Sequence, residues 1–194
     1  MGKAKKPRAV KLVIGMLAKN KKLFDTAEEF FVKRFGPIDY KSPVIPFGYT
    51  NYYKKEMGGP LKRKFISFKG PISPGKIAKI KLATNSIEQK IAINTNSSRL
   101  RSKNIVRASE ASRELKRRIN IDPGYISDSK LVLATTKDYF HRIYLNRGIY
   151  AEVALKWRRN GFEPFEWTYP DYRSKEYLDI LNAIRNNFMR DYAG

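Results

Sequence analysis

Apolar residues recur along the first part of the chain with two different periods, and each period predicts an element. Residues 10–17 form a short apolar run rich in Val, Ile and Leu, which has the length of a buried strand. In residues 23–35 the apolar side chains recur at the spacing of one helix face, and Gly36-Pro37 is a typical helix stop. Residues 38–47 are extended but contain two prolines, which favours the edge of a sheet.

The middle of the chain is more polar and is divided by turn signals. Residues 49–60 combine Tyr, Asn, Lys and Gly, which predicts a surface loop, and residues 64–69 predict a strand. Ser73-Pro74 is typical of a helix start, and the helix that follows carries an isoleucine stripe: Ile77, Ile80, Ile87 and Ile91. Residues 92–104 are rich in Ser and Asn and predict a flexible segment, which a short basic helix follows over residues 105–117.

The last part alternates in the manner of antiparallel strands before a closing helix. A strand over residues 118–122 ends in Asp122-Pro-Gly, a strong turn signal, and further strands are predicted over 131–135, 141–145 and 150–157. In the last of these, alternation places Leu155 inward and Glu152 outward. Asn160-Gly161 predicts a hairpin turn, and Ser174 caps a helix with one apolar stripe: Tyr177, Leu181, Ile184 and Phe188.

The order of these elements predicts an α+β fold. Through residue 121 the order is strand, helix, strand, strand, helix, strand, which is the split βαβ pattern of ferredoxin-like domains. Antiparallel strands and a C-terminal helix extend this predicted core of residues 10–121. We therefore expect a single domain over residues 1–194, with a basic N-terminal tail (1–9) and a flexible basic insertion (92–115).

Composition excludes several kinds of site. The chain has no cysteine and one histidine, so disulfides, cysteine nucleophiles and sites with several His ligands cannot form within it. We expect no zinc, haem or iron–sulfur site, and the metal that the composition leaves open is magnesium on oxygen ligands. No apolar run is long enough to span a membrane, and the N-terminal residues do not resemble a signal peptide, which favours a cytoplasmic protein.

The charge balance points to anionic partners. Lys and Arg number 40 against 18 Asp and Glu, a net charge of +22, which attracts RNA or phosphorylated ligands. A lysine-rich surface that serves solubility alone is the alternative. One cluster is rich in arginine, whose planar guanidinium binds phosphate at two points, and it is our candidate nucleic-acid interface: Arg99, Arg101, Lys103, Arg107, Arg113, Arg117 and Arg118.

Several strings along the chain resemble one known family. They include the apolar run from Val10, Phe35-Gly-Pro-Ile-Asp, Asn120-Ile-Asp-Pro-Gly-Tyr, the run from Leu131 to Tyr139, and Trp167-Thr-Tyr-Pro-Asp-Tyr. Their order is similar to the uncharacterised bacterial family of domain of unknown function 4416, over nearly the whole chain. The resemblance implies no established activity, although members have sometimes been labelled GTP-binding. Residues 92–115 are longer and more basic than the usual connection in that family.

Two nucleotide-binding motifs can be tested on the residues themselves. Residues 70–76 have the GxxxxGK spacing of a phosphate-binding loop, but Ile77 replaces the magnesium-binding Ser or Thr, and Pro71 and Pro74 lack amide hydrogens. A Pro-rich turn that leads into a helix explains residues 70–77 better than a phosphate-binding loop does. The stacking aromatics of an RNA-recognition domain are also missing, because Phe65 and Phe68 are three residues apart and lie on opposite faces of a strand.

The carboxy-terminal half contains the residue types of a phosphoryl- or acyl-transfer site. His141 could act as a general base, Asp122 or Asp171 could orient it or hold magnesium, and Arg142 with Lys130 could neutralise an anion. Structural roles are the alternative for His141 and for Asp122 in its turn. Further candidate ligand contacts are Lys137, Tyr144, Tyr125, Tyr53 and Glu56.

The sequence therefore leaves three hypotheses. The first is a module that binds a polyanion, most of all RNA, through the basic clusters. The second is a small enzyme that acts on a nucleotide or another phosphorylated substrate around Asp122, His141, Arg142 and Asp171. The third is an assembly protein whose basic faces contact an acidic partner. The substrate and the occurrence of catalysis do not follow from the sequence.

Overall fold

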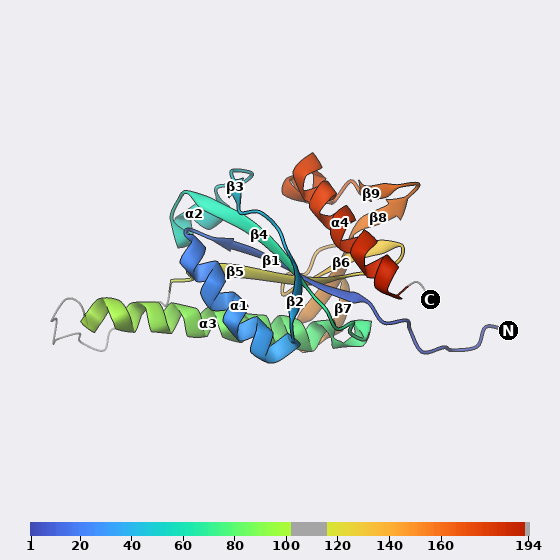
Figure 1. Cartoon of the computed structure of the whole chain (residues 1–194), viewed down its shortest axis with the longest axis horizontal. Coiled ribbons are helices and arrows are strands. Elements are labelled where there is room, and N and C mark those ends of the chain that lie inside the picture. Colours follow the sequence, from blue (N-terminus) through green and yellow to red (C-terminus); the bar gives the residue numbers. More distant parts are fainter. Residues whose placement is uncertain (102–115, 193–194) are drawn as a thin grey trace.

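The computed structural model describes residues 1–101 and 116–192, and within these it describes no side chains for 54–55 and 94–101. Figure 1 shows a twisted sheet between two helical layers, with residues 1–9 extending from it without helix or strand. The elements are β1 (Lys11–Ala18), α1 (Lys21–Phe35), β2 (Ile38–Lys41), β3 (Ile45–Phe47), α2 (Tyr52–Met57), β4 (Leu61–Phe68), η1 (Pro74–Lys76), α3 (Ile77–Arg101), β5 (Ile119–Ile126), β6 (Lys130–Thr135), β7 (Ile143–Asn146), β8 (Ile149–Arg158), β9 (Gly161–Pro164), η2 (Pro170–Arg173) and α4 (Lys175–Tyr192).

The described strands form one antiparallel sheet in the order β2-β4-β1-β5-β6-β8-β7. β3 also pairs with β4, and β9 pairs with β8 as a hairpin. Every residue of β1, which lies between β4 and β5, is buried. This architecture confirms the mixed α+β class, with a large antiparallel sheet and a C-terminal helix.

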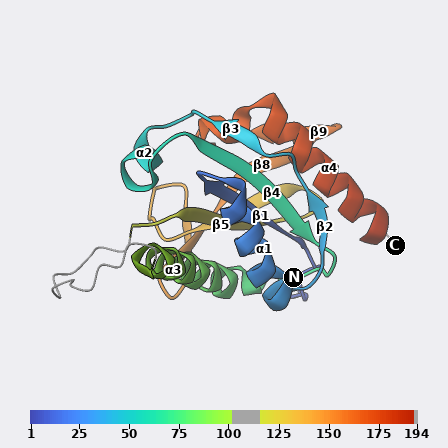
Figure 2. The same cartoon turned by 60° about the vertical axis from the view of Figure 1, so that its left-hand side comes forward.

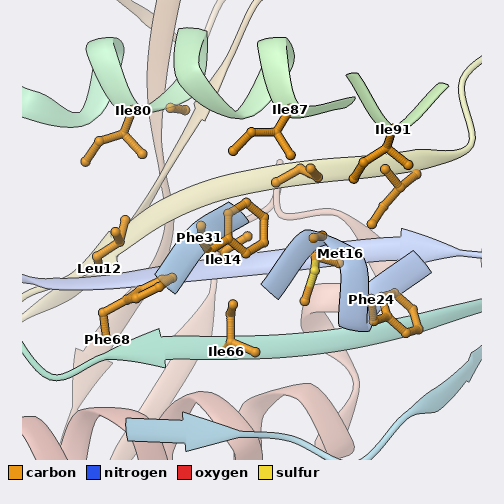
Figure 3. Close-up of a cluster of buried hydrophobic side chains, with 14 of the residues drawn as sticks. Leu12, Ile14, Met16, Phe24, Phe31, Ile66, Phe68, Ile80, Ile87 and Ile91 are labelled. Atoms are coloured by element: carbon orange, nitrogen blue, oxygen red, sulfur yellow. The ribbon is translucent and has the colours of Figure 1, made fainter. Parts of the chain in front are cut away.

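Helices α1 and α3 cover one face of the sheet, as Figure 2 shows. Their apolar stripes meet alternate residues of β1 and β4, among them Ile14 and Ile66. In Figure 3 the isoleucines of α3 lie above Phe24 and Phe31 of α1, and the side chains of both helices belong to the core on this face of the sheet. The apolar residues that recur with the helical period in α1 and α3 are thus the ones that pack in this core.

The C-terminal end of α1 agrees with its sequence signal, and a side chain caps the other end. The Asn20 side chain accepts a hydrogen bond from the Leu23 backbone N–H at 3.2 Å, which caps the first turn. Gly36 ends the helix with φ +94°, a conformation that a residue with a Cβ adopts only with strain.

Helix α4 covers the other face of the sheet. Its predicted stripe, from Tyr177 to Phe188, is buried, and Tyr177 packs at the centre of a second core with Phe65 and Leu155. Ser174 begins the helix as predicted, because its hydroxyl accepts a hydrogen bond from the Tyr177 N–H at 3.3 Å. Among the described residues no helix is both long enough and apolar enough to cross a membrane.

Three predictions of local secondary structure were wrong. Residues 92–101 continue α3 instead of leaving it, and residues 52–57 form the short helix α2 inside the predicted loop. The prediction of a loop rested on polarity, because the apolar stripe ends at Ile91 and Ala92, which are buried, and is followed by the exposed Ile93. The predicted basic helix over 105–117 lies mostly outside the described residues, and Lys116 and Arg117 are not helical.

Asp122-Pro-Gly is the third correction, because it is not a turn. β5 runs through it in register with β1, with Pro123 opposite Ile14. Gly124 is required by close approach to β6, since a Cβ at this position would lie 2.5 Å from the Val132 carbonyl oxygen. Pairing with β1 on the one side and contact with β6 on the other hold the segment extended against its local turn preference.

Replacing Gly124 by Ala should therefore destabilise the fold by about 1–3 kcal/mol, because the added methyl group overpacks against β6. The measurement is urea unfolding of the wild type and of Gly124→Ala under the same conditions. Gly70→Ala is the matched control, because no atom lies within 4 Å of its Cβ position. We expect it to change the stability by less than about 0.5 kcal/mol; equal stabilities of the two variants would contradict the role given to Gly124.

Candidate ligand-binding site

A cavity of about 820 Å³ lies where strands β5 and β6 separate. The two strands pair only from Gly124 to Ile126, opposite Leu133 to Leu131. Beyond this point Asn120 and Asp122 of β5 line one side of the cavity, and residues 133–137 line the other. The remaining walls come from β4, α2, α3, β8 and the η2 segment. The early end of β5–β6 pairing thus creates the site.

The buried guanidinium of Arg63 forms the inner wall. The residue is 2% exposed, and its Nη2 donates a hydrogen bond to Asp171 Oδ2 at 2.8 Å. Its Nη1 lies 3.5 Å from Asp122 Oδ2 and, within the described part of the chain, is buried without a hydrogen bond. The rings of Phe47, Phe65, Tyr172 and Tyr177 surround the guanidinium at 5.4 to 5.8 Å.

Gly15 on β1 leaves the space for this arrangement. A Cβ on Gly15 would lie 3.1 Å from the Phe65 ring and 3.3 Å from both Arg63 Nη1 and the Tyr172 hydroxyl. Burial raises the pKa of Asp171, while the Arg63 guanidinium beside it favours the carboxylate. Burial also raises the pKa of the Tyr172 hydroxyl well above its ordinary value, so this hydroxyl is neutral.

One face of helix α3 continues this inner wall: Lys81, Asn85, Glu88, Gln89 and Ala92. Lys81 Nζ donates to the Ile121 carbonyl oxygen at 2.8 Å, and Glu88 Oε1 accepts from the Ile121 N–H at 2.6 Å. Burial, with a smaller contribution from Asp122, raises the pKa of Glu88, and Lys81, Arg117 and the Ile121 N–H lower it; the net effect is a rise from 4.5 to about 7. The wall therefore contains a carboxyl group that titrates near neutral pH.

Arg117 joins α2 to α3 across the cavity wall. Its Nε lies 3.2 Å from Glu56 Oε1 and 3.7 Å from Glu88 Oε2, and its Nη1 donates to Asn120. We predicted that Arg117 contacts nucleic acid, but the structure places it in this network of carboxylates. Tyr53 also lines the cavity, and burial raises the pKa of its hydroxyl.

A second buried ion pair closes the opposite wall. Arg142 donates from Nε to Glu152 Oε2 at 2.6 Å, from Nη1 to the Lys137 carbonyl oxygen at 3.0 Å, and from Nη2 to the Tyr169 hydroxyl at 2.9 Å. Glu152 is 4% exposed, so the prediction that it faces outward was wrong. Its carboxylate is buried because Arg142 and His141 both contact it.

His141 lies behind this wall and does not line the cavity. Its Nε2 lies 3.0 Å from Glu152 Oε2, and its ring is stacked between those of Tyr139 and Trp167. Its Nδ1 is buried and has no hydrogen-bond partner among the described residues. This placement lets His141 orient Glu152, and the predicted role as a general base stays a prediction.

The structure brings together six of the residues that the sequence suggested for catalysis or ligand binding: Tyr53, Glu56, Asp122, Lys137, Arg142 and Asp171. Three others lie elsewhere. Lys130 is exposed at the start of β6, Tyr125 packs against the core under α1 and α3, and Tyr144 is exposed on the edge strand β7.

The nucleic-acid prediction falls mainly on residues without described side chains. Arg99 and Arg101 are on α3, but their side chains are not described, and Lys103, Arg107 and Arg113 lie outside the described residues. Arg118 is half-buried. This interface stays a prediction.

Sequence reasoning missed Arg63, Lys81, Glu88 and Glu152. A signal for Arg63 existed, because strand alternation places it on the same face as Leu61 and Phe65. Lys81 and Glu88 are seven residues apart, which is about two helical turns. Helical periodicity therefore places both on one face of α3. Within the described part of the chain, no three His, Cys, Asp or Glu side chains are grouped so that they could hold a metal ion, and the expectation of magnesium stays a prediction.

Comparison with family models gives one match, Domain of unknown function (DUF4416), over residues 8–107 and 98–188. The chain belongs to this family. The two matched ranges overlap at residues 98–107, where α3 ends, and together they include every wall of the cavity. Comparison with the curated proteins and with the solved structures found no match.

The raised pKa of Glu88 predicts a pH-dependent stability. A carboxyl group whose pKa is higher in the folded state than in the unfolded state stabilises the fold while protonated, and this contribution is lost as the pH rises from about 4.5 to about 7. Glu88→Gln keeps the acceptor for the Ile121 N–H but does not titrate. We expect the stability of the wild type relative to this variant to fall by about 2–3 kcal/mol between pH 4.5 and pH 8.

Urea unfolding of both proteins at several pH values measures this difference. A difference that stays constant with pH would show that Glu88 titrates at its ordinary value. Glu29→Gln on the exposed side of α1 is the control, and its difference from the wild type should not change over this range.

Proposed function

We propose that the cavity binds a small phosphorylated molecule that carries a planar ring, as a nucleotide does. The observation that carries the proposal is the position of Lys137. Its Nζ lies 4.3 Å from the centre of the Tyr52 ring, and no carboxylate among the described residues forms an ion pair with it. A cation at the wall of a cavity without an internal partner is a natural contact for a phosphate.

The charges of the other walls support this location for the phosphate. Each of the other cations that line the cavity faces at least one carboxylate: Arg63, Lys81, Arg117 and Arg142. A dianionic phosphate at the inner wall would meet Asp122, Asp171 and Glu88, which repel it. At Lys137 it meets a positive charge alone.

The aromatic residues around Lys137 support a ligand with a ring. Tyr52, Tyr139 and Tyr169 line the cavity and are 56%, 52% and 44% exposed. Tyrosine rings that remain open to solvent offer flat apolar faces on which a base or another planar group stacks. The volume of about 820 Å³ is also in the range of known small-molecule sites.

A thermal-shift panel tests the proposal. It compares AMP, GMP, phenyl phosphate and ribose 5-phosphate with adenosine, guanosine, phenol and ribose in 150 mM salt, which screens non-specific attraction. We expect the phosphorylated ring compounds to raise Tm and their unphosphorylated counterparts to have little effect. Equal shifts within each pair, or no shift with any phosphorylated compound, would contradict the proposal.

Lys137→Ala should weaken binding of AMP about tenfold or more, because a hydrogen bond to a charged group contributes about 1.5–3 kcal/mol. Isothermal titration calorimetry measures the affinity. Lys130→Ala is the matched control: it removes an exposed lysine at the start of β6, the strand that leads to Lys137, outside the cavity, and should leave the affinity unchanged. The same loss in both variants would mean that net charge alone attracts the ligand.

A second proposed function is RNA binding, which the net charge of +22 favours. A fluorescence-anisotropy titration of a short single-stranded RNA at several salt concentrations tests it. We expect log affinity to fall with log salt by about 0.7 per phosphate contact, and the double variant Arg99→Ala/Arg101→Ala to reduce this slope by up to about 1.4. Excess AMP should not displace the RNA, because binding through the net charge does not use the cavity. Binding that does not depend on salt would contradict this function.

We also propose that residues 10–121 are a ferredoxin-like unit. The sheet order β2-β4-β1-β5 supports this, because each strand is antiparallel to its neighbours and the two connecting helices α1 and α3 lie on one face. The cavity then lies on the border between this unit and the strands that extend it.

A further inference from the structure

The two oxygens of the Glu88 carboxyl group have different surroundings. Oε1 is held by the Ile121 N–H at 2.6 Å, which ties helix α3 to β5. Oε2 lies 3.7 Å from Arg117 Nε, beyond hydrogen-bond distance, and receives no hydrogen bond from any residue that the structure describes. Glu88 lines the cavity, so Oε2 is an acceptor that a ligand can use.

The groups around Glu88 set its protonation. Lys81 of its own helix and Arg117 favour the carboxylate, whereas burial and Asp122 of β5 favour the neutral acid, and the balance raises the pKa to about 7. Glu56 of α2 acts indirectly, because it shares Arg117 with Glu88. Both protonation states are therefore populated at neutral pH, and a ligand that prefers one of them shifts the balance.

The chemistry of the inner wall selects the part of the ligand that reaches it. Asp122 and Glu88 supply carboxyl oxygens there, and their charge disfavours a phosphate. A hydroxyl group fits, because it donates a hydrogen bond to a carboxylate and brings no negative charge.

We propose that Glu88, as a carboxylate, accepts a hydrogen bond from a hydroxyl group of the ligand and thereby selects phosphorylated compounds that carry a sugar or another polyol. This inference rests on the proposed function, with the phosphate at Lys137 and the hydroxyl at the inner wall. Binding draws Glu88 into its ionised form, so the protonated fraction releases its proton to solvent.

The inference makes affinity depend on pH in a defined direction. The carboxylate form is about a tenth of the population one pH unit below the pKa and about nine tenths one unit above it, and the apparent affinity follows the competent fraction. AMP should bind about tenfold more tightly at pH 8 than at pH 6 through this residue. Phenyl phosphate has a ring and a phosphate but no hydroxyl, so it shows only the smaller dependence that its own phosphate produces.

The experiment is isothermal titration calorimetry of AMP and phenyl phosphate at pH 6 and pH 8. In Glu88→Gln, AMP should retain no more pH dependence than phenyl phosphate. Glu29→Gln is the control, because it removes an exposed carboxylate on α1, outside the cavity, and should keep the steeper dependence of AMP. Equal pH dependence of the two ligands in the wild type, or loss of the steeper dependence in Glu29→Gln as well, would overturn the inference.

A measurement without ligand separates this inference from the proposed function. Carbon-13 NMR of glutamate carboxyl groups in the wild type, with Glu88→Gln for assignment, follows the ionisation of Glu88 directly. Titration near pH 7 supports the proton release that the inference includes, and titration near pH 4.5 overturns that release, while the hydroxyl contact at Glu88 is decided by the calorimetry and phosphate binding at Lys137 is untouched. Absence of binding by both AMP and phenyl phosphate would instead overturn the proposed function, and this inference with it.

Discussion

The buried guanidinium of Arg63 is the interaction on which the rest of the site depends. A charge that is 2% exposed is stable only if other groups neutralise it and accept its hydrogen bonds. Asp171 and Asp122 neutralise it, and Asp171 and the Tyr177 hydroxyl accept two of its hydrogen bonds, from two regions of the chain that are distant from Arg63 in the sequence. Gly15 on β1 provides the space. The hydrogen bonds of Arg63 at the inner wall therefore also hold helix α4 against the sheet.

The cavity lies where two neighbouring strands of the sheet separate. Gly124 allows β5 and β6 to approach closely at one end of their contact. Beyond Gly124 the strands no longer pair, and residues from both faces of the sheet reach the opening: Lys81 and Glu88 from the side of α3, Arg63 and Asp171 from the side of α4. A site that both layers share requires both helical faces to be packed correctly.

The distribution of charge explains how a strongly basic chain has a nearly neutral cavity. Within the described residues, the lining holds five carboxyl groups and five cations, although the whole chain has 18 acidic and 40 basic residues. Acidic residues are therefore concentrated where buried cations need partners, and the excess of lysine and arginine is left for other surfaces. The net charge of the chain and the nearly neutral lining of the cavity are therefore separate properties, and each favours a different class of ligand.

The sequence by itself determined the elements whose burial repeats locally. The spacing of apolar residues in α1, α4 and β1 predicts correctly which side chains are buried, because exposure within a regular element repeats with the period of that element. Six site residues were also found by residue type, but their meeting was not predicted. Only the tertiary structure decided that Glu152 is buried, that Asp122-Pro-Gly is a strand, and that Arg63 meets Asp171 across 108 residues. The burial and protonation of charged side chains such as Arg63 and Glu152 depend on partners from distant elements. The local sequence pattern does not show which residues those partners are.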